Sequence, residues 1–258
     1  MLRLATLTSL LVLTAAAAMA EDIKVGVSPG EHAEIMEEVA KVAAPMGLNI
    51  DVVEFSDYVI PNTALADGDI EANSFQHVPY LDNQMKDRGF DLVVVGTTIT
   101  TPMGIYSDKI DDLATLDDGA KVAIPNDPTN GGRALLLLQD LGLVTLTEGT
   151  GLVPSPLDIA ENPKGLKFLE LDAAQLPRTL ADADIAIINT NYAIASGLSP
   201  KDDAIAMEKA ENPYVNVIVV RKGDEDQPWV KTLVDAYHSD EVKAFIDNSY
   251  HGAVITSW

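Results

Sequence analysis

The 258-residue sequence predicts an α/β protein with two lobes, two hinge crossovers and a ligand cleft between the lobes. Two observations lead to this fold class. Short apolar strand patterns alternate with helical patterns along most of the chain, which is typical of sheets covered by helices. Two extended apolar segments, residues 99–106 and 214–221, interrupt this alternation and divide the chain. We therefore expect one lobe over residues 21–100 plus 220–258 and the other over residues 101–219.

The first predicted lobe begins with a parallel βαβ unit. Residues 23–27 (IKVGV) alternate apolar and polar side chains, as a half-buried strand does, and residues 48–55 (LNIDVVEF) repeat the pattern. Between them, residues 31–44 place apolar side chains on one helical face and acidic residues in the first turn. A strand, a helix and a strand at this spacing predict two parallel neighbours.

The next strands of this lobe are short and alternate with helices. We expect a helix at residues 61–66, a strand at 70–75 and a helix at 76–88 that Gly89 closes. Residues 91–98 form the following strand. Its continuous run of leucine and valine indicates burial on both faces.

The second predicted lobe is centred on residues 122–140 (VAIPNDPTNGGRALLLLQD), which predict a strand, a tight loop and a helix. A short helix precedes this unit, and strands and helices alternate after it until two final helices return to the first lobe. The expected elements are helices at 113–120, 175–181, 192–196, 229–237 and 241–249, and strands at 166–171 and 184–189.

The helix start within residues 122–140 is the strongest candidate for binding chemistry. Backbone N–H groups at a helix start are unpaired and carry partial positive charge, which attracts anions. Gly131 and Gly132 let the backbone approach a ligand closely, and the Arg133 guanidinium fits a carboxylate or phosphate in two hydrogen bonds. The glycine–lysine pattern of nucleotide-binding loops is not present. The alternative is a capped helix with a solvated Arg133.

Phe75, His77 and Tyr80 lie where a predicted strand ends and a helix begins. Open α/β sheets bind ligands at such carboxyl ends of strands. These side chains would form an apolar wall tipped with hydrogen-bond donors. The alternative is that Phe75 and Tyr80 belong to the core and that His77 caps the helix.

Three asparagines occupy positions where an amide needs a partner. Asn189 and Asn191 follow the predicted strand at 184–189, and Asn216 lies inside an apolar strand. Because a buried amide is normally hydrogen-bonded, Asn216 pairs either with the protein or with the amino and carboxylate groups of a ligand.

The composition excludes several kinds of partner and site. Lys plus Arg total 17 against 40 Asp plus Glu, and the resulting charge of -23 repels nucleic acid and anionic lipid. The sequence contains no cysteine, which rules out disulfides and thiolate sites. The four histidines are scattered and match no metal-binding or hydrolase motif. We expect no metal, no cofactor and no catalytic residues, with a secreted enzyme as the alternative class.

Residues 1–20 have the pattern of a secretory signal peptide. Arg3 gives a positive start, and the apolar run that follows is short for a membrane span. Ala18-Met19-Ala20 then has the small-x-small form of a cleavage site. We expect cleavage after Ala20, and the alternative is that the segment is retained as an anchor.

Six segments, spread over nearly the whole mature chain, carry a family resemblance. They are IKVGV at 23–27, PN at 61–62, FQHVPYLD at 75–82, VAIPNDPTNGGRALLLLQ at 122–139, AQLPR at 174–178 and NPYVNVIVVRK at 212–222. Together they resemble the methionine-binding substrate-binding proteins of ABC importers, the MetQ/NlpA lipoprotein family. The third and fourth segments are specific to this family, whereas IKVGV is not.

The resemblance implies a two-lobed periplasmic-binding-protein fold of the second type, no catalysis, and delivery of methionine to a membrane permease and its ATPase. It also implies the polar part of a binding site. Arg133 would hold the ligand carboxylate, and Asn130, Asn191 and Asn216 would hold its other polar groups. Asn189 is a weaker candidate, because Asn191 fits the family position better.

The resemblance further implies that Phe75, His77 and Tyr80 line the pocket for the ligand side chain, with Tyr58 as a weaker candidate. The chain departs from the family in one respect, because it lacks the cysteine that usually follows the signal and carries a lipid. We therefore expect a monomer that diffuses freely in the periplasm without a lipid anchor. The alternative ligands are another apolar amino acid or a methionine-containing dipeptide.

Overall fold

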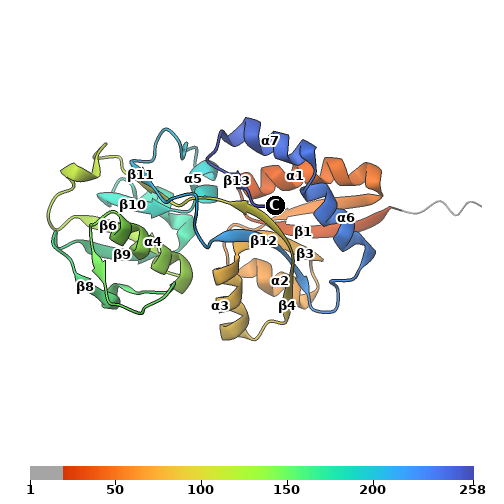
Figure 1. Ribbon diagram of the computed structural model, residues 1–258, viewed down its shortest axis with the longest axis horizontal. Helices are drawn as coiled ribbons and strands as arrows, with labels where there is room; N and C mark the ends of the chain where they lie inside the picture. Colours follow the sequence, from red (N-terminus) through yellow and green to blue (C-terminus); the bar gives the residue numbers. More distant parts are fainter. Residues whose placement is uncertain (1–19) are drawn as a thin grey trace, which may run out of the picture.

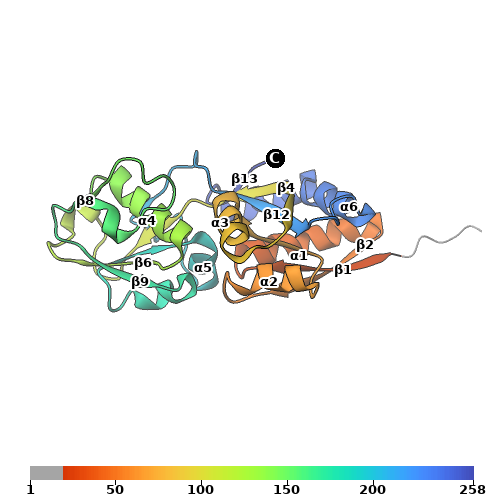
Figure 2. The same cartoon turned by 90° about the horizontal axis from the view of Figure 1, so that it is seen from below.

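The protein is described by a computed structural model over residues 20–258, so the predicted signal peptide lies, apart from Ala20, outside the described residues. Two mixed sheets of six and five strands lie end to end along the molecule and carry helices on their faces (Figures 1 and 2). The chain passes between them through residues 101–103 and 208–214. The predicted α/β fold class is confirmed, and the residue boundaries of the lobes stay a prediction.

The six-stranded sheet contains the predicted parallel βαβ unit. Its strand order is β13-β4-β12-β3-β1-β2. β1 runs parallel to both β2 and β3, whereas β12 is antiparallel to both β3 and β4. The strands are β1 (Glu21–Val27), β2 (Leu48–Glu54), β3 (Ala72–His77), β4 (Leu92–Thr100), β12 (Val215–Arg221) and β13 (Ile255–Thr256).

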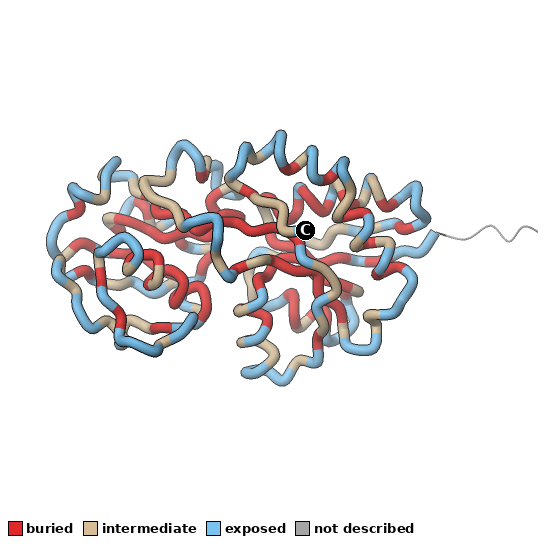
Figure 3. The backbone as a smooth tube through the Cα atoms, in the orientation of Figure 1, coloured by how far each residue is buried: buried red, intermediate tan, exposed pale blue. Residues whose placement is uncertain are grey.

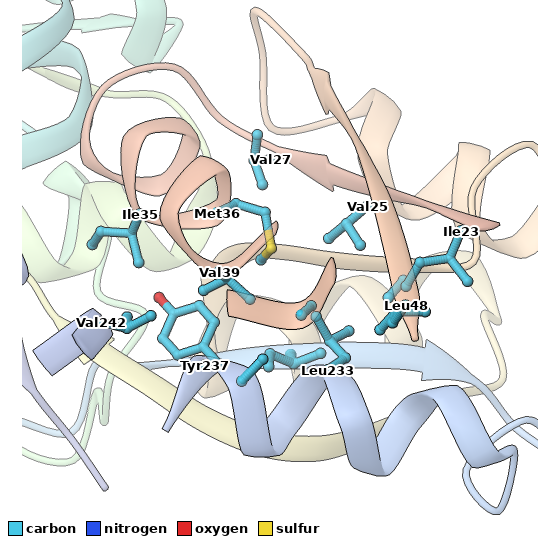
Figure 4. Close-up of a cluster of buried hydrophobic side chains, with 14 of the residues drawn as sticks. Ile23, Val25, Val27, Ile35, Met36, Val39, Leu48, Leu233, Tyr237 and Val242 are labelled. Atoms are coloured by element: carbon cyan, nitrogen blue, oxygen red, sulfur yellow. The ribbon is translucent and has the colours of Figure 1, made fainter. Parts of the chain in front are cut away.

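Helices on two sides of this sheet bury two apolar clusters. In one of them, Met36 and Val39 of α1 pack with Leu233 and Tyr237 of α6 and with Val242 of α7 (Figure 4). The other lies beneath α2 and α3. These helices are α1 (Glu31–Ala43), α2 (Ile60–Asp67), α3 (Val78–Arg88), α6 (Pro228–Tyr237) and α7 (Asp240–Tyr250), and a short 3₁₀ helix, η1 (Ala44–Met46), follows α1.

The five-stranded sheet has the order β11-β5-β10-β6-β9, and β6 runs parallel to both β9 and β10. Helix α4 follows β6 and buries Leu135 and Leu138 against Val122 and Ile124 of that strand. The strands are β5 (Gly104–Tyr106), β6 (Lys121–Pro125), β9 (Lys167–Leu171), β10 (Ile185–Ile188) and β11 (Ala206–Met207), with a separate pair β7 (Thr145–Leu146) and β8 (Ile159–Glu161). The helices are α4 (Pro128–Asp140), α5 (Thr190–Ala195), η2 (Leu113–Thr115), η3 (Pro156–Asp158) and η4 (Ala173–Thr179).

Two local predictions differ from the structure. Burial of the β4 leucine and valine run on both faces is only partly right. Leu92 is buried in the cluster beneath α2 and α3, and Val93 and Val95 pack half-buried against the other cluster, but Val94 is 41% exposed. The helix predicted at 175–181 is the 3₁₀ helix η4, which contains Pro177. Proline has no backbone N–H to donate, so the segment cannot complete a regular α-helix. Figure 3 shows that burial is concentrated in the central strands.

Candidate ligand-binding site

A small cavity lies between the two sheets, close to the first crossover. All eight residues that the sequence predicted for the site line it, namely Tyr58, Phe75, His77, Tyr80, Asn130, Arg133, Asn191 and Asn216. Four further lining residues were not among the predicted eight, namely His32, Gln76, Thr101 and Asn189.

Three aromatic rings form one wall of the cavity. Phe75 lies on β3, Tyr80 lies in the first turn of α3, and Tyr58 lies in the loop before α2. The Tyr58 ring centroid lies 6.0 Å from those of both Phe75 and Tyr80, and the Tyr80 hydroxyl donates to the Tyr58 carbonyl at 2.8 Å. Phe75 and Tyr80 are buried, as the core alternative required, but they also face the cavity. The wall offers an apolar ligand group ring faces and edges.

His77 combines the two roles that the sequence left open. It is the N-cap of α3, where its Nδ1 accepts a hydrogen bond from the Tyr80 backbone N–H at 3.1 Å. Nε2 therefore carries the proton and donates to Asn130 Oδ1 at 3.2 Å, across to α4. Burial, with the nearby Arg133 charge, lowers the pKa of His77 to about 3. The ring is thus neutral and joins the two halves of the molecule.

Arg133 enters the cavity with one edge of its guanidinium already occupied. Nε donates to both carboxylate oxygens of Glu208 at 3.1 Å, and Nη2 donates to Glu208 and, at 2.8 Å, to the Thr101 carbonyl. The group also stacks 4.2 Å above the Tyr214 ring and is 2% exposed. Nη1 makes no hydrogen bond to residues 20–258. The predicted solvated alternative is wrong, and a ligand anion would meet Nη1 rather than the whole fork.

The start of α4 does not form an empty anion-binding site. The helix begins at Pro128, earlier than expected, and Asp127 caps it by accepting from the Asn130 N–H at 2.9 Å. The two glycines lie inside the first turns and serve packing, since a Cβ on Gly131 would be 2.7 Å from the Pro125 carbonyl oxygen. A Cβ on Gly132 would likewise meet the 152–154 loop. The expectation that these glycines admit a ligand is wrong, because protein backbone fills the space.

Amide groups form the polar end of the cavity. Asn130 Oδ1 accepts from Asn189 Nδ2 at 2.8 Å, and Asn191 Oδ1 accepts from the Tyr58 hydroxyl at 2.5 Å. Asn216 Nδ2 donates to the Ile99 carbonyl at 3.2 Å. Asn189 Oδ1 and Asn191 Nδ2 are buried and have no partner among the described residues. This end therefore presents one free acceptor and one free donor, which suits a ligand with both an amino and a carboxylate group.

The two halves of the molecule meet tightly around the cavity. The Tyr192 hydroxyl donates to the Ser56 carbonyl at 3.2 Å, and the Tyr58 and Tyr192 ring centroids are 5.0 Å apart. A Cβ on Gly30 would be 2.5 Å from the Asn191 carbonyl oxygen, so the start of α1 touches α5 backbone to backbone. The cleft is thus closed, and glycine at position 30, with φ of 85°, permits that approach.

A buried acid follows this contact. Glu31 is 0% exposed and neither carboxyl oxygen has a hydrogen-bond partner among the described residues. Burial raises the pKa of Glu31 to about 8, and the charge of Glu34 on the same helix adds to this. His32 Nε2 lies 4.0 Å away, and burial lowers the pKa of His32 to about 4. Burial raises the pKa of four tyrosines that interact with this acid, and ionised Glu31 would raise it further; they are Tyr58, Tyr106, Tyr237 and Tyr250.

Comparison with known proteins identifies the family. The profile of the NlpA lipoprotein family matches residues 23–258. The chain belongs to the NlpA lipoprotein family. A relative from Escherichia coli (strain K12), the D-methionine-binding lipoprotein MetQ, is 52% identical over 239 residues, which cover 92% of this chain and 88% of that protein.

Solved structures of family relatives agree with this architecture. A nutrient binding protein from Burkholderia cenocepacia bound to methionine has 55% identity and a TM-score of 0.89, covering 92% of this chain and all of the other (100%). An ABC transporter periplasmic substrate-binding protein from Coxiella burnetii has 47% identity and a TM-score of 0.88, covering 91% and 100% of the two chains. The predicted family and fold are confirmed.

The described part of this NlpA-family chain, residues 20–258, has no cluster of three or more His, Cys, Asp or Glu side chains that could hold a metal ion. It also has no helix that is both long and apolar enough to cross a membrane.

Proposed function

We propose that the protein captures methionine in the closed cavity and delivers it to the permease and ATPase of an ABC importer, without chemical change to the ligand. The main support for this proposal is that a single cavity combines an aromatic wall with a buried guanidinium and unpaired amide groups. These features match an apolar side chain on one end and an amino-acid head group on the other. The methionine complex of the Burkholderia relative supports the same ligand.

Within this proposal each side chain has a role. Arg133 Nη1 and Asn191 Nδ2 are the free donors for the ligand carboxylate, and Asn189 Oδ1 is a free acceptor for its ammonium group. Asn130 has both amide atoms occupied by protein partners, so it orients His77 and Asn189. Asn216 lines the same end of the cavity.

The aromatic wall of Tyr58, Phe75 and Tyr80 contacts the ligand side chain and determines which side chains bind well. Burying a methionine side chain is worth about 1.5–3 kcal/mol, and a sulfur near an aromatic edge adds about 0.3–1.5 kcal/mol. Norleucine is linear and lacks only the sulfur, whereas leucine is branched. The expected order of affinity is methionine, norleucine, leucine, with glutamate and lysine far weaker because an apolar wall cannot solvate their charges.

Competition titrations on wild type and Phe75→Ala test this proposal. Phe75→Ala should lower methionine affinity and reduce the differences within the series, because it removes one ring of the wall. Val94→Ala, at an exposed position far from the cavity lining, should leave the order intact. Equal affinities for leucine and methionine in wild type, or an unchanged order in Phe75→Ala, would show that the 75–80 segment is core only.

We also propose that the mature protein is a monomer that is free in the periplasm. The relatives carry lipoprotein names, but this sequence contains no cysteine to bear a lipid. The small-x-small pattern at residues 18–20 predicts release after Ala20. Intact mass and light scattering of protein from the periplasmic fraction check both points. A membrane-bound species that still contains Arg3 would contradict them.

A further inference from the structure

Three buried amides form a closed hydrogen-bonded unit beside the cavity. Asn62 of α2 donates to Gln76 Oε1 at 2.8 Å, and Gln76 Nε2 donates back to Asn62 Oδ1 at 2.7 Å. Asn73 joins them, since its Nδ2 donates to Asn62 Oδ1 and its Oδ1 accepts from Gln76 Nε2, both at 2.9 Å. The three residues are 0%, 0% and 2% exposed in chain order. We call this group the amide triad.

The amide triad links the two segments that supply the aromatic wall. Asn73 and Gln76 lie on β3, and Gln76 stands between the cavity residues Phe75 and His77. Asn62 lies in the first turn of α2, four residues after Tyr58. The triad therefore fixes the start of α2 against β3, and with it the place of the Tyr58 ring over Phe75.

Apart from the amide triad, the start of α2 is held by Asp57 Oδ1, which accepts hydrogen bonds from the Val59 and Ile60 backbone N–H groups at 2.7 and 3.0 Å. Val59 and Ile60 at the helix start are 44% and 50% exposed, so they give it little apolar anchorage. Leu65, near the other end, is fully buried. Within a dry interior, an amide network that is fully paired holds one arrangement, because any shift leaves a buried donor or acceptor unpaired. Apolar side chains of the same size would not impose that single position.

We propose that the amide triad of Asn62, Asn73 and Gln76 is a positioning unit that sets the Tyr58 ring and so the side-chain selectivity of the cavity. This triad proposal rests on the proposed function, because selectivity is measured as the difference in affinity between methionine and its analogues. Tyr58 transmits the effect to the second half of the molecule, since its hydroxyl donates to Asn191 Oδ1. Asn62 and Asn73 do not line the cavity and so act without touching the ligand, whereas Gln76 also lines it.

The test is a double-mutant cycle between Asn62→Ala and Tyr58→Ala, with affinities for methionine and leucine measured by calorimetry. Asn62→Ala should weaken methionine binding at least about fivefold and reduce the difference in affinity between methionine and leucine. In the Tyr58→Ala background the same change should have little further effect, because the ring that the triad positions is gone. Additive effects in the cycle, or wild-type selectivity in Asn62→Ala, overturn the proposal.

Controls separate positioning from general destabilisation. Ser74→Ala alters a buried β3 residue that neither belongs to the triad nor lines the cavity, and it should keep wild-type selectivity. Asn73→Ala replaces Asn62→Ala in the cycle if the latter does not fold. A variant with a lower melting temperature but wild-type selectivity shows that the triad is structural only.

A crystal structure of Asn62→Ala without ligand gives a readout that is independent of methionine. The Tyr58 and Phe75 ring centroids, 6.0 Å apart in the wild type, should move relative to each other. An unchanged ring arrangement overturns the triad proposal. Absence of methionine binding by wild type instead overturns the proposed function and leaves this structural readout to decide on the triad.

Discussion

Arg133→Ala is expected to weaken methionine binding by about two to four orders of magnitude. The guanidinium is 2% exposed, so a ligand carboxylate at its free Nη1 would form an ion pair that is shielded from water. Losing one partner of such a buried pair costs about 3–5 kcal/mol, which corresponds to that change in affinity. Because the aromatic wall is untouched, methionine, norleucine and leucine should lose affinity alike.

Calorimetric titration checks this expectation, provided that folding is verified by circular dichroism. Arg133→Ala also removes the partner of Glu208, so the double variant Arg133→Ala/Glu208→Gln is measured beside it to remove the unpaired charge. Arg178→Ala, at an exposed position of the same half of the molecule, should bind as wild type does. Unchanged affinity in a folded Arg133→Ala variant would mean that Arg133 serves only to pair with Glu208.

Methionine affinity is also expected to peak near pH 6.5 and to fall above it, because Glu31 is buried in the closed cleft. In an open, solvated cleft this carboxyl would have the ordinary pKa of 4.5, whereas in the closed structure burial raises the pKa to about 8. Between these values closure takes up a proton. The acid therefore favours closure at low pH, and affinity falls by up to about tenfold per pH unit as pH rises toward the higher pKa.

The buried histidines give the opposite slope at lower pH. In the closed structure burial lowers the pKa of His32 from 6.5 to about 4 and that of His77 from 6.5 to about 3, and solvation in an open cleft would restore the ordinary value. Below their open-state pKa, closure must expel their protons, so affinity rises with pH up to that value. Above it Glu31 alone titrates, and the net profile is bell-shaped.

Titrations over about pH 5 to 9 measure this profile. Glu31→Gln should abolish the fall in methionine affinity above about pH 6.5 and keep the rise in affinity below it, since the amide has no proton to lose. Glu37→Gln, at an exposed position on the same helix, should keep the whole bell-shaped dependence of affinity on pH. A wild-type affinity that is constant from about pH 6.5 to 8 would show that closure does not bury an ionised Glu31.

Sequence patterns predicted those site residues that lie at local landmarks. His77 ends β3 and Phe75 lies two residues before it, while Asn191 and Arg133 lie early in the helices that follow β10 and β6. All of them line the cavity. Strand ends on one sheet edge converge in α/β folds, so a local pattern was enough to place these residues near a common cleft.

The partners of those residues could not be predicted in the same way. Glu208 lies 75 positions from Arg133 along the chain and follows a two-residue strand that has no clear pattern. The sequence predicted His32 in a helix and Gln76 at the start of one, and no local pattern marked either of them as a site residue. The roles of Gly131 and Gly132 also depended on distant backbone, which a sequence pattern does not show.

We propose that one cavity holds methionine between an aromatic wall and a polar end. A crystal of the protein with ordinary methionine in its chain, soaked in free selenomethionine, tests this proposal most directly. We expect one selenium anomalous peak beside the rings of Tyr58, Phe75 and Tyr80, with the ligand carboxylate at Arg133 Nη1. A peak outside the cavity, or a ligand with its carboxylate among the rings, would contradict it.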